Sequence, residues 1–84
     1  MEYHLFTVPH RCVPCRALES QLESIPDWKN KIEYINADDM TEVQKTLAEK
    51  VKVFKLPSLT TDKNIVVVNT LGLFNKIKEI CTSE

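Results

Sequence analysis

Apolar and polar residues alternate along the chain in patterns that predict seven secondary-structure elements. Strands are predicted over residues 3–8, 31–37, 56–61 and 64–69, which are rich in β-branched and aromatic residues. Helices are predicted over residues 16–25, 38–54 and 70–81, where apolar residues recur every three or four positions. The predicted order of elements is therefore β-α-β-α-β-β-α.

The connections between these elements predict how the sheet is assembled. A helix joins the first two strands, so they are expected to be parallel and linked by a right-handed crossover. A short turn joins the last two strands, which predicts an antiparallel hairpin. A chain of 84 residues is long enough for one domain. We therefore expect a single α/β domain over residues 1–84, with a four-stranded mixed sheet and helices on both faces.

Two local patterns sharpen this prediction. Thr41 and Gln44 have the spacing of a capping box, so the second helix is expected to begin next to Thr41. Val43, Leu47 and Val51 recur every four residues and are expected to form its apolar face. The run IVVVN at residues 65–69 is apolar at successive positions, which predicts a strand covered on both sides.

Composition excludes several classes of function. The formal net charge of −1 gives no electrostatic basis for binding nucleic acid or an anionic membrane. The chain begins with an acidic residue and a short apolar stretch, which predicts neither a signal peptide nor a membrane span. We therefore expect a cytoplasmic monomer. Its three cysteines argue against a scaffold held together by disulfides.

The segment HRCVPCR, residues 10–16, contains a Cys-x-x-Cys pair formed by Cys12 and Cys15. The pair lies at the predicted junction between the first strand and the first helix. The free N–H groups of a helix N-terminus stabilise a thiolate, so we expect an exposed, reactive Cys12. Cys15 is expected to point inward beneath it. These features favour a redox-active pair.

Neighbouring residues support the pair. Pro14 suits the first turn of a helix, where its missing N–H needs no partner, and it stiffens the segment between the sulfurs. Val13 completes the dipeptide between the cysteines, and Arg11 adds positive potential before them. His10 is a candidate for tuning Cys12, although a loop histidine without a role is an equal alternative.

Zinc binding is the competing interpretation of the pair. His4, His10 and Cys81 are candidates to complete four ligands. Structural zinc sites usually have a second paired ligand unit, and this chain has none, so no metal is expected. Cys81 is expected to be a partly buried helix residue, and Trp28 to cover the core. A thioredoxin-fold module that never cycles between dithiol and disulfide is the other alternative.

The order of elements, the Cys-Val-Pro-Cys motif and Pro57 at the start of the third strand together resemble the thioredoxin superfamily. The chain looks most like the small dithiol glutaredoxins and glutaredoxin-like thioredoxins. The resemblance implies a thioredoxin fold, with Cys12 as the nucleophile and Cys15 as the resolving cysteine. It also implies a cis peptide bond before Pro57, and pairing of the Leu56 backbone with a bound peptide or glutathione.

The resemblance further implies a thiol–disulfide oxidoreductase that reduces protein disulfides, with ribonucleotide reductase as one candidate substrate. Glutathione or a thioredoxin reductase-type flavoprotein would reduce the oxidised cysteine pair again. No bound cofactor is expected. Pro14 matches thioredoxins rather than glutaredoxins. The Gly-Gly and Asp that hold glutathione in glutaredoxins are replaced by VNTLG, residues 68–72. Asn69 and Thr70 lie there at a predicted helix N-terminus, which can bind a carboxylate.

Overall fold

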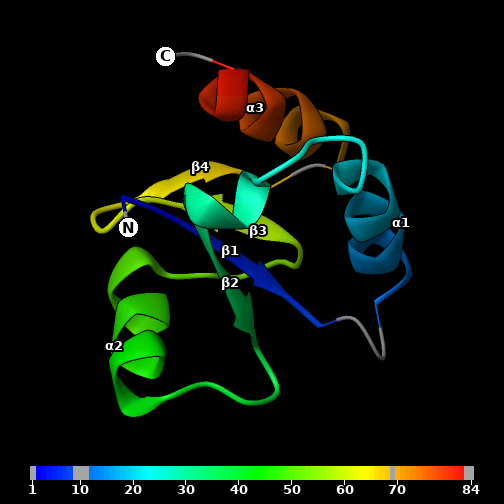
Figure 1. The fold of residues 1–84 in the computed structure, drawn as a ribbon. Helices are drawn as coiled ribbons and strands as arrows, with labels where there is room; N and C mark the ends of the chain where they lie inside the picture. The colour runs from blue at the N-terminus through cyan, green and yellow to red at the C-terminus, as the bar shows by residue number, and fades with distance from the viewer. Residues whose placement is uncertain (1, 9–11, 69, 83–84) are drawn as a thin grey trace.

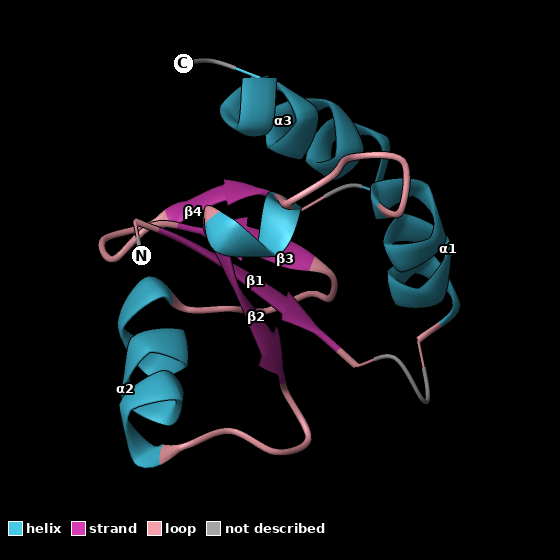
Figure 2. Cartoon of the chain, in the orientation of Figure 1, coloured by secondary structure: helices cyan, strands magenta, loops and turns pink. Residues whose placement is uncertain are grey.

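The computed structural model describes residues 2–8, 12–68 and 70–82 of the chain. Its elements follow the predicted order, with one additional short 3₁₀-helix, η1, before the second strand (Figures 1 and 2). The strands are β1 (Tyr3–Thr7), β2 (Ile32–Asn36), β3 (Ser58–Thr60) and β4 (Ile65–Val67). The helices are α1 (Val13–Leu22), η1 (Trp28–Asn30), α2 (Glu42–Val51) and α3 (Thr70–Thr82).

The four strands form one mixed sheet in the order β2-β1-β3-β4. β1 is parallel to β2, and β3 is antiparallel to both β1 and β4, as the connections predict. Helices α1 and α3 cover one face of the sheet and α2 covers the other (Figure 1). The fold is therefore α/β with three α-helices and a four-stranded mixed sheet. This architecture is consistent with a thioredoxin-like fold.

The main core lies between the sheet and the pair α1 and α3. Leu5 of β1, Leu18 of α1 and Ile77 of α3 are completely buried there. Burying a side chain of this size stabilises the fold by about 1.5–3 kcal/mol. Trp28 of η1 closes the edge of this core at 8% exposure, which confirms the prediction that it covers the core. The packing fixes α1, and with it the position of the cysteine pair.

Helix α2 begins as its sequence predicts. The Thr41 side chain accepts a hydrogen bond from the Gln44 backbone N–H, and the Gln44 side chain accepts one from the Thr41 N–H, which completes the capping box. The predicted apolar face is only partly correct, because Val51 is buried whereas Val43 is 80% exposed. Val43 lies in the first turn of α2, whereas Val51 is the last residue of the helix.

The prediction for residues 65–69 is also only partly correct. β4 spans Ile65–Val67, and its residues are half-buried rather than covered on both sides. The reason is its place in the sheet: β4 is the last strand in the order and has β3 as its only neighbour in the described sheet. None of the described helices is long and apolar enough to cross a membrane.

Candidate redox site

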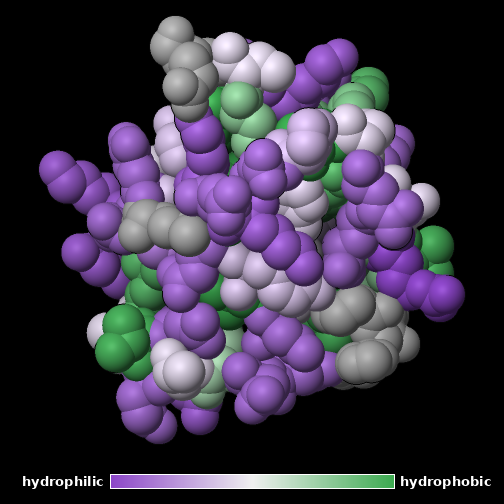
Figure 3. All heavy atoms as spheres, in the orientation of Figure 1, coloured by the Kyte–Doolittle hydropathy of each residue, from purple (hydrophilic) through white to green (hydrophobic). Residues whose placement is uncertain are grey.

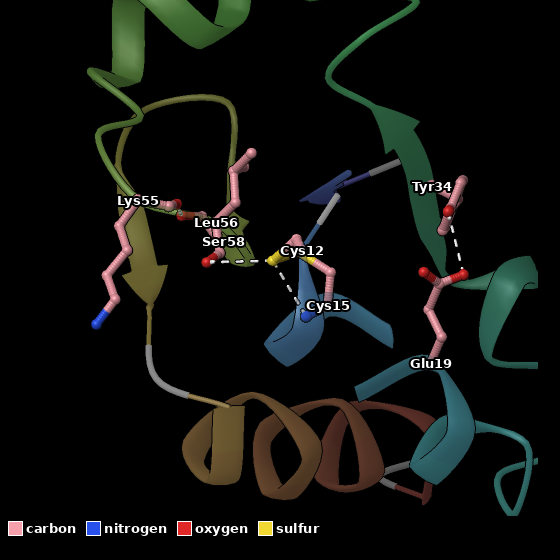
Figure 4. The surroundings of a disulfide bond; sticks show 7 residues. All are labelled: Cys12, Cys15, Glu19, Tyr34, Lys55, Leu56 and Ser58. Carbon is pink, nitrogen blue, oxygen red and sulfur yellow. Dashed lines mark hydrogen bonds between the residues drawn. A yellow bond between two sulfur atoms is a disulfide. The ribbon is translucent and has the colours of Figure 1, made fainter. Parts of the chain in front are cut away.

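The sulfur atoms of Cys12 and Cys15 are joined in a disulfide, with their Cα atoms 5.1 Å apart (Figure 4). Cys12 is the N-cap of α1 and has extended backbone angles, and Cys15 lies in the first turn of the helix. Cys12 is partly exposed and Cys15 is completely buried. The structure therefore confirms that Cys15 is shielded, whereas Cys12 is less exposed than predicted.

The helix N-terminus acts directly on Cys12. The backbone N–H of Cys15 donates a hydrogen bond to the Cys12 sulfur, with an N···S distance of 3.2 Å. In the reduced protein the same N–H stabilises a Cys12 thiolate, because it is one of the donors that a helix leaves without intrahelical partners. The first turn of α1 contains no acidic residue that would oppose this effect. Cys12 is thus the sulfur whose local electrostatics suit a nucleophile.

The residues around the pair occupy the expected positions where the structure describes them. Pro14 lies in the first turn of α1, and Val13 is 76% exposed beside Cys12. Arg11 and His10 fall outside the described residues, so the effects predicted for them stay predictions.

The loop before β3 brings two more predicted residues to the pair. The Leu56–Pro57 peptide bond is cis, as the resemblance implies, and Pro57 is buried. The Leu56 carbonyl oxygen lies 3.9 Å from the Cys12 sulfur, across a separation of 44 residues (Figure 4). The hydroxyl of Ser58 donates to the Lys55 carbonyl oxygen and holds this loop in shape. Asn69 and the Thr70 side chain, predicted to bind a carboxylate, lie outside the described part.

Two functional candidates that the sequence did not reveal lie behind the pair. The Tyr34 hydroxyl of β2 donates a hydrogen bond to Glu19 Oε1 of α1 at 3.1 Å (Figure 4). Glu19 Oε2 is buried and has no hydrogen-bond partner. Burial raises the pKa of Tyr34, and the negative charge of Glu19 raises it further. The sequence contains one signal that points to Glu19: it lies four residues after Cys15. Residues at this spacing share one face of a helix.

The structure places the other cysteine and the first histidine away from the pair. Cys81 of α3 is partly buried, as expected, and burial raises the pKa of its thiol. The two ring nitrogens of His4 lie 2.6 Å from Glu33 Oε1 and 2.6 Å from Asp62 Oδ1. Among the described residues, no three histidine, cysteine or acidic side chains are grouped so that they could hold a metal ion.

Three exposed apolar residues lie near the starts of the helices that follow β1, β2 and β4. Val13 follows β1, Val43 begins α2 after β2, and Leu71 begins α3 after β4, which runs parallel to β1. These three residues and Phe54 are the exposed large hydrophobic residues of the described chain, at 68–80% exposure. Figure 3 shows hydrophobic groups reaching a largely hydrophilic surface in separate patches.

A pocket of about 450 Å³ opens beside the segment that precedes β3. Its walls are mainly apolar and include Met40, Ala48, Phe54 and Leu56. Leu56 belongs both to this pocket and to the contact with Cys12. An apolar side chain seated in the pocket would therefore lie on a surface continuous with the disulfide.

No family model matches the chain, and no curated protein matches it.

Proposed function

We propose that this protein is a thiol–disulfide oxidoreductase of the thioredoxin superfamily. The observation that carries the proposal is the hydrogen bond from the Cys15 N–H to the Cys12 sulfur at the N-terminus of α1. It supports a thiolate on the partly exposed sulfur and leaves the second sulfur shielded within bonding distance. A disulfide that served only as a structural cross-link would need neither the activation nor the exposure.

The proposed reaction has two steps. The Cys12 thiolate attacks one sulfur of a substrate disulfide, forms a mixed disulfide and releases the other substrate sulfur as a thiolate. The Cys15 thiol then loses its proton and attacks Cys12, which closes the Cys12–Cys15 disulfide and releases the second substrate thiolate. The substrate disulfide is reduced by two electrons, and the cysteine pair is oxidised by two.

We propose a protein segment as the substrate. A backbone next to Cys12, such as that of Leu56, can pair with an extended peptide, which is a common mode of recognition. The exposed apolar residues and the adjoining pocket suit a peptide better than they suit the small, charged glutathione molecule. The resemblance to the superfamily makes ribonucleotide reductase one candidate substrate. Glutathione and a thioredoxin reductase-type flavoprotein are the candidate reductants, and the cytoplasm is the proposed location.

A trapping experiment tests the proposal. In Cys15→Ser the first step proceeds but the second cannot, so substrates should remain bound to Cys12 as mixed disulfides that dithiothreitol releases. The matched control is Cys81→Ser, which removes a cysteine from α3 and should trap nothing. The proposal is wrong if Cys15→Ser retains no protein and the wild-type protein reduces no protein disulfide.

Reduction of the oxidised protein by each candidate reductant identifies the electron source. Purified oxidised protein is mixed either with glutathione, glutathione reductase and NADPH or with thioredoxin reductase and NADPH. Consumption of NADPH with an added protein disulfide is then followed. The apolar surroundings of the pair lead us to expect faster turnover with the flavoprotein. Faster turnover with glutathione would contradict that preference but would leave the redox function intact.

A further inference from the structure

We propose that the carboxylate of Glu19 accepts the proton of Cys15 when that thiol attacks the mixed disulfide. This role rests on the redox function proposed above. Cys15 is completely buried, so its thiol cannot hand the proton directly to bulk water. A nearby group must accept the proton, because the thiolate and not the thiol is the attacking species.

The helix places Glu19 on the same face as Cys15. The two residues are four positions apart in α1, which spans Val13–Leu22 without interruption. Side chains at this spacing have Cβ atoms about 5–6 Å apart. A carboxylate on such a neighbour is within reach of the thiol, either directly or through one water molecule.

One oxygen of the carboxylate is left free for this role. Glu19 Oε1 accepts the hydrogen bond from Tyr34, whereas Oε2 is buried with no partner among the described residues. Figure 4 shows the unpaired oxygen on the side of the carboxylate that lies nearer the two cysteines. Leaving a buried acceptor unpaired costs about 1–3 kcal/mol, so the arrangement does not serve stability.

Tyr34 holds the carboxylate in place and is a positioning residue. Burial raises the pKa of Tyr34, and the charge of Glu19 raises it further. The phenol therefore stays protonated at neutral pH and keeps donating to Oε1. Its ring is itself fixed by Trp28, with ring centroids 6.2 Å apart, and by the Lys29 ammonium 5.3 Å from its centroid.

Glu19 is a partly buried residue of α1, and its Oε2 atom is buried. The Lys29 ammonium lies over the Tyr34 ring. From β1, Thr7 contributes a neutral hydroxyl, and from α3, Leu73 and Ile77 contribute apolar side chains. Arg16, the other charged residue of α1, is exposed.

The proton and the electrons balance within the resolving step. The Cys15 thiol gives its proton to the Glu19 carboxylate, which becomes a carboxylic acid. The Cys15 sulfur then forms a bond to the Cys12 sulfur, and the bond from Cys12 to the substrate sulfur breaks. Its electron pair leaves with the substrate thiolate. Glu19 later returns the proton to water or to the departing thiolate.

A two-phase reaction with a chromogenic disulfide separates the steps. Reduced protein in a Cys81→Ser background is mixed with an equimolar amount of 5,5′-dithiobis(2-nitrobenzoate) in a stopped-flow spectrometer. The first equivalent of coloured thiolate reports attack by Cys12, and the second reports resolution by Cys15. The variants are Glu19→Gln and Tyr34→Phe. The matched control is Glu23→Gln, the same substitution at an exposed position at the end of the same helix.

We expect Glu19→Gln to slow the second phase by about 10²-fold, the lower end of what a positioned proton acceptor contributes. The first phase should change little. The second phase should also become proportional to the hydroxide concentration, because water-borne base must then remove the proton. Tyr34→Phe should slow the second phase by a smaller factor, and Glu23→Gln should match the parent protein.

The outcomes separate the two proposals. If the parent protein releases no second equivalent, the redox function itself is wrong. If the parent releases both equivalents, and Glu19→Gln and Tyr34→Phe each keep its second-phase rate and pH profile, the role of Glu19 is overturned while the redox function stands. Should Glu19→Gln not fold, Tyr34→Phe alone decides between these outcomes, because it removes only the hydroxyl that positions the carboxylate.

Discussion

The ionisable groups near the two ends of strand β1 differ in whether they have hydrogen-bond partners. At the start of the strand, both ring nitrogens of buried His4 are paired, with Glu33 and with Asp62. Past the other end, the Cys12 sulfur is partly exposed, and the Glu19 carboxylate beside the cysteines has one buried oxygen without a partner. The unpaired hydroxyl of Thr60, beside His4, does not change this contrast because it carries no charge.

This contrast separates a polar cluster that stabilises the fold from one that suits the proposed redox reaction. A buried polar group contributes to stability only when its hydrogen bonds are made, and an unpaired one opposes folding. The His4 cluster links β1, β2 and the turn between β3 and β4 and has the properties of a structural cross-link. The cysteine end keeps free hydrogen-bonding capacity where the proposed reaction would need to accommodate a proton and a substrate.

The largest effect is expected from removing the nucleophile. Cys12→Ser should lower protein-disulfide reduction by more than about 10³-fold, because no other thiol of the chain is placed to attack. Its unfolding midpoint under reducing conditions should stay close to that of the wild-type protein. Activity is measured by the turbidity of insulin as its disulfides are reduced, and stability by urea unfolding. Residual activity within tenfold of wild type would show that the cysteine end is not the reactive one.

The alkylation rates of Cys12 and Cys81 provide a second comparison. Burial raises the pKa of this thiol, whereas a helix N-terminus lowers that of a thiol such as Cys12. At neutral pH we expect iodoacetamide to alkylate Cys12 about 10²-fold faster than Cys81, because the thiolate reacts. Mass spectrometry of the reduced protein over time measures both rates. Equal rates would mean that the hydrogen bond at the helix N-terminus does not activate Cys12.

The sequence predicts well what local signals specify. The Cys-x-x-Cys motif predicts the position of the cysteine pair at the start of α1, and Thr41 with Gln44 predicts the start of α2. Both depend on residues within one helical turn. The pairing of His4 with Asp62 joins residues 58 positions apart, and it depends on the register of three strands. The sequence carries no local signal for such a contact.

The same reason explains the wrong or missing details at the site. Val43 satisfies the helical spacing but is exposed, so periodicity alone misplaces it. The Glu19–Tyr34 hydrogen bond needs both the helical face and the strand register to be known. Pro57 was placed beside Cys12 only through the resemblance to a family, because loop closure across 44 residues is not encoded locally.

Breaking the pairing at His4 should affect stability and spare the chemistry. His4→Leu preserves bulk but removes both hydrogen bonds, and we expect it to lower the free energy of unfolding by about 1–3 kcal/mol. Urea unfolding measures the change, and the insulin assay at a temperature where the variant is folded measures activity. Lys63→Leu, an exposed change in the neighbouring turn, is the control. A stable His4→Leu with impaired activity would reverse the roles assigned to the two ends.

The smallest effect is expected from the acid dependence of the same cluster. The hydrogen bond with His4 lowers the pKa of Asp62 from its ordinary value of 3.8. A carboxyl whose pKa is lower in the folded than in the unfolded state stabilises the fold above the unfolded pKa. That contribution is lost as the pH falls through the folded-state value. The stability advantage of wild type over Asp62→Asn should therefore be full above pH 3.8 and shrink below it, as measured by urea unfolding at a series of pH values.

The control is Asp39→Asn, at an exposed position near the cysteine end, which should show no such trend. An identical trend in both variants would contradict a specific link between Asp62 and His4.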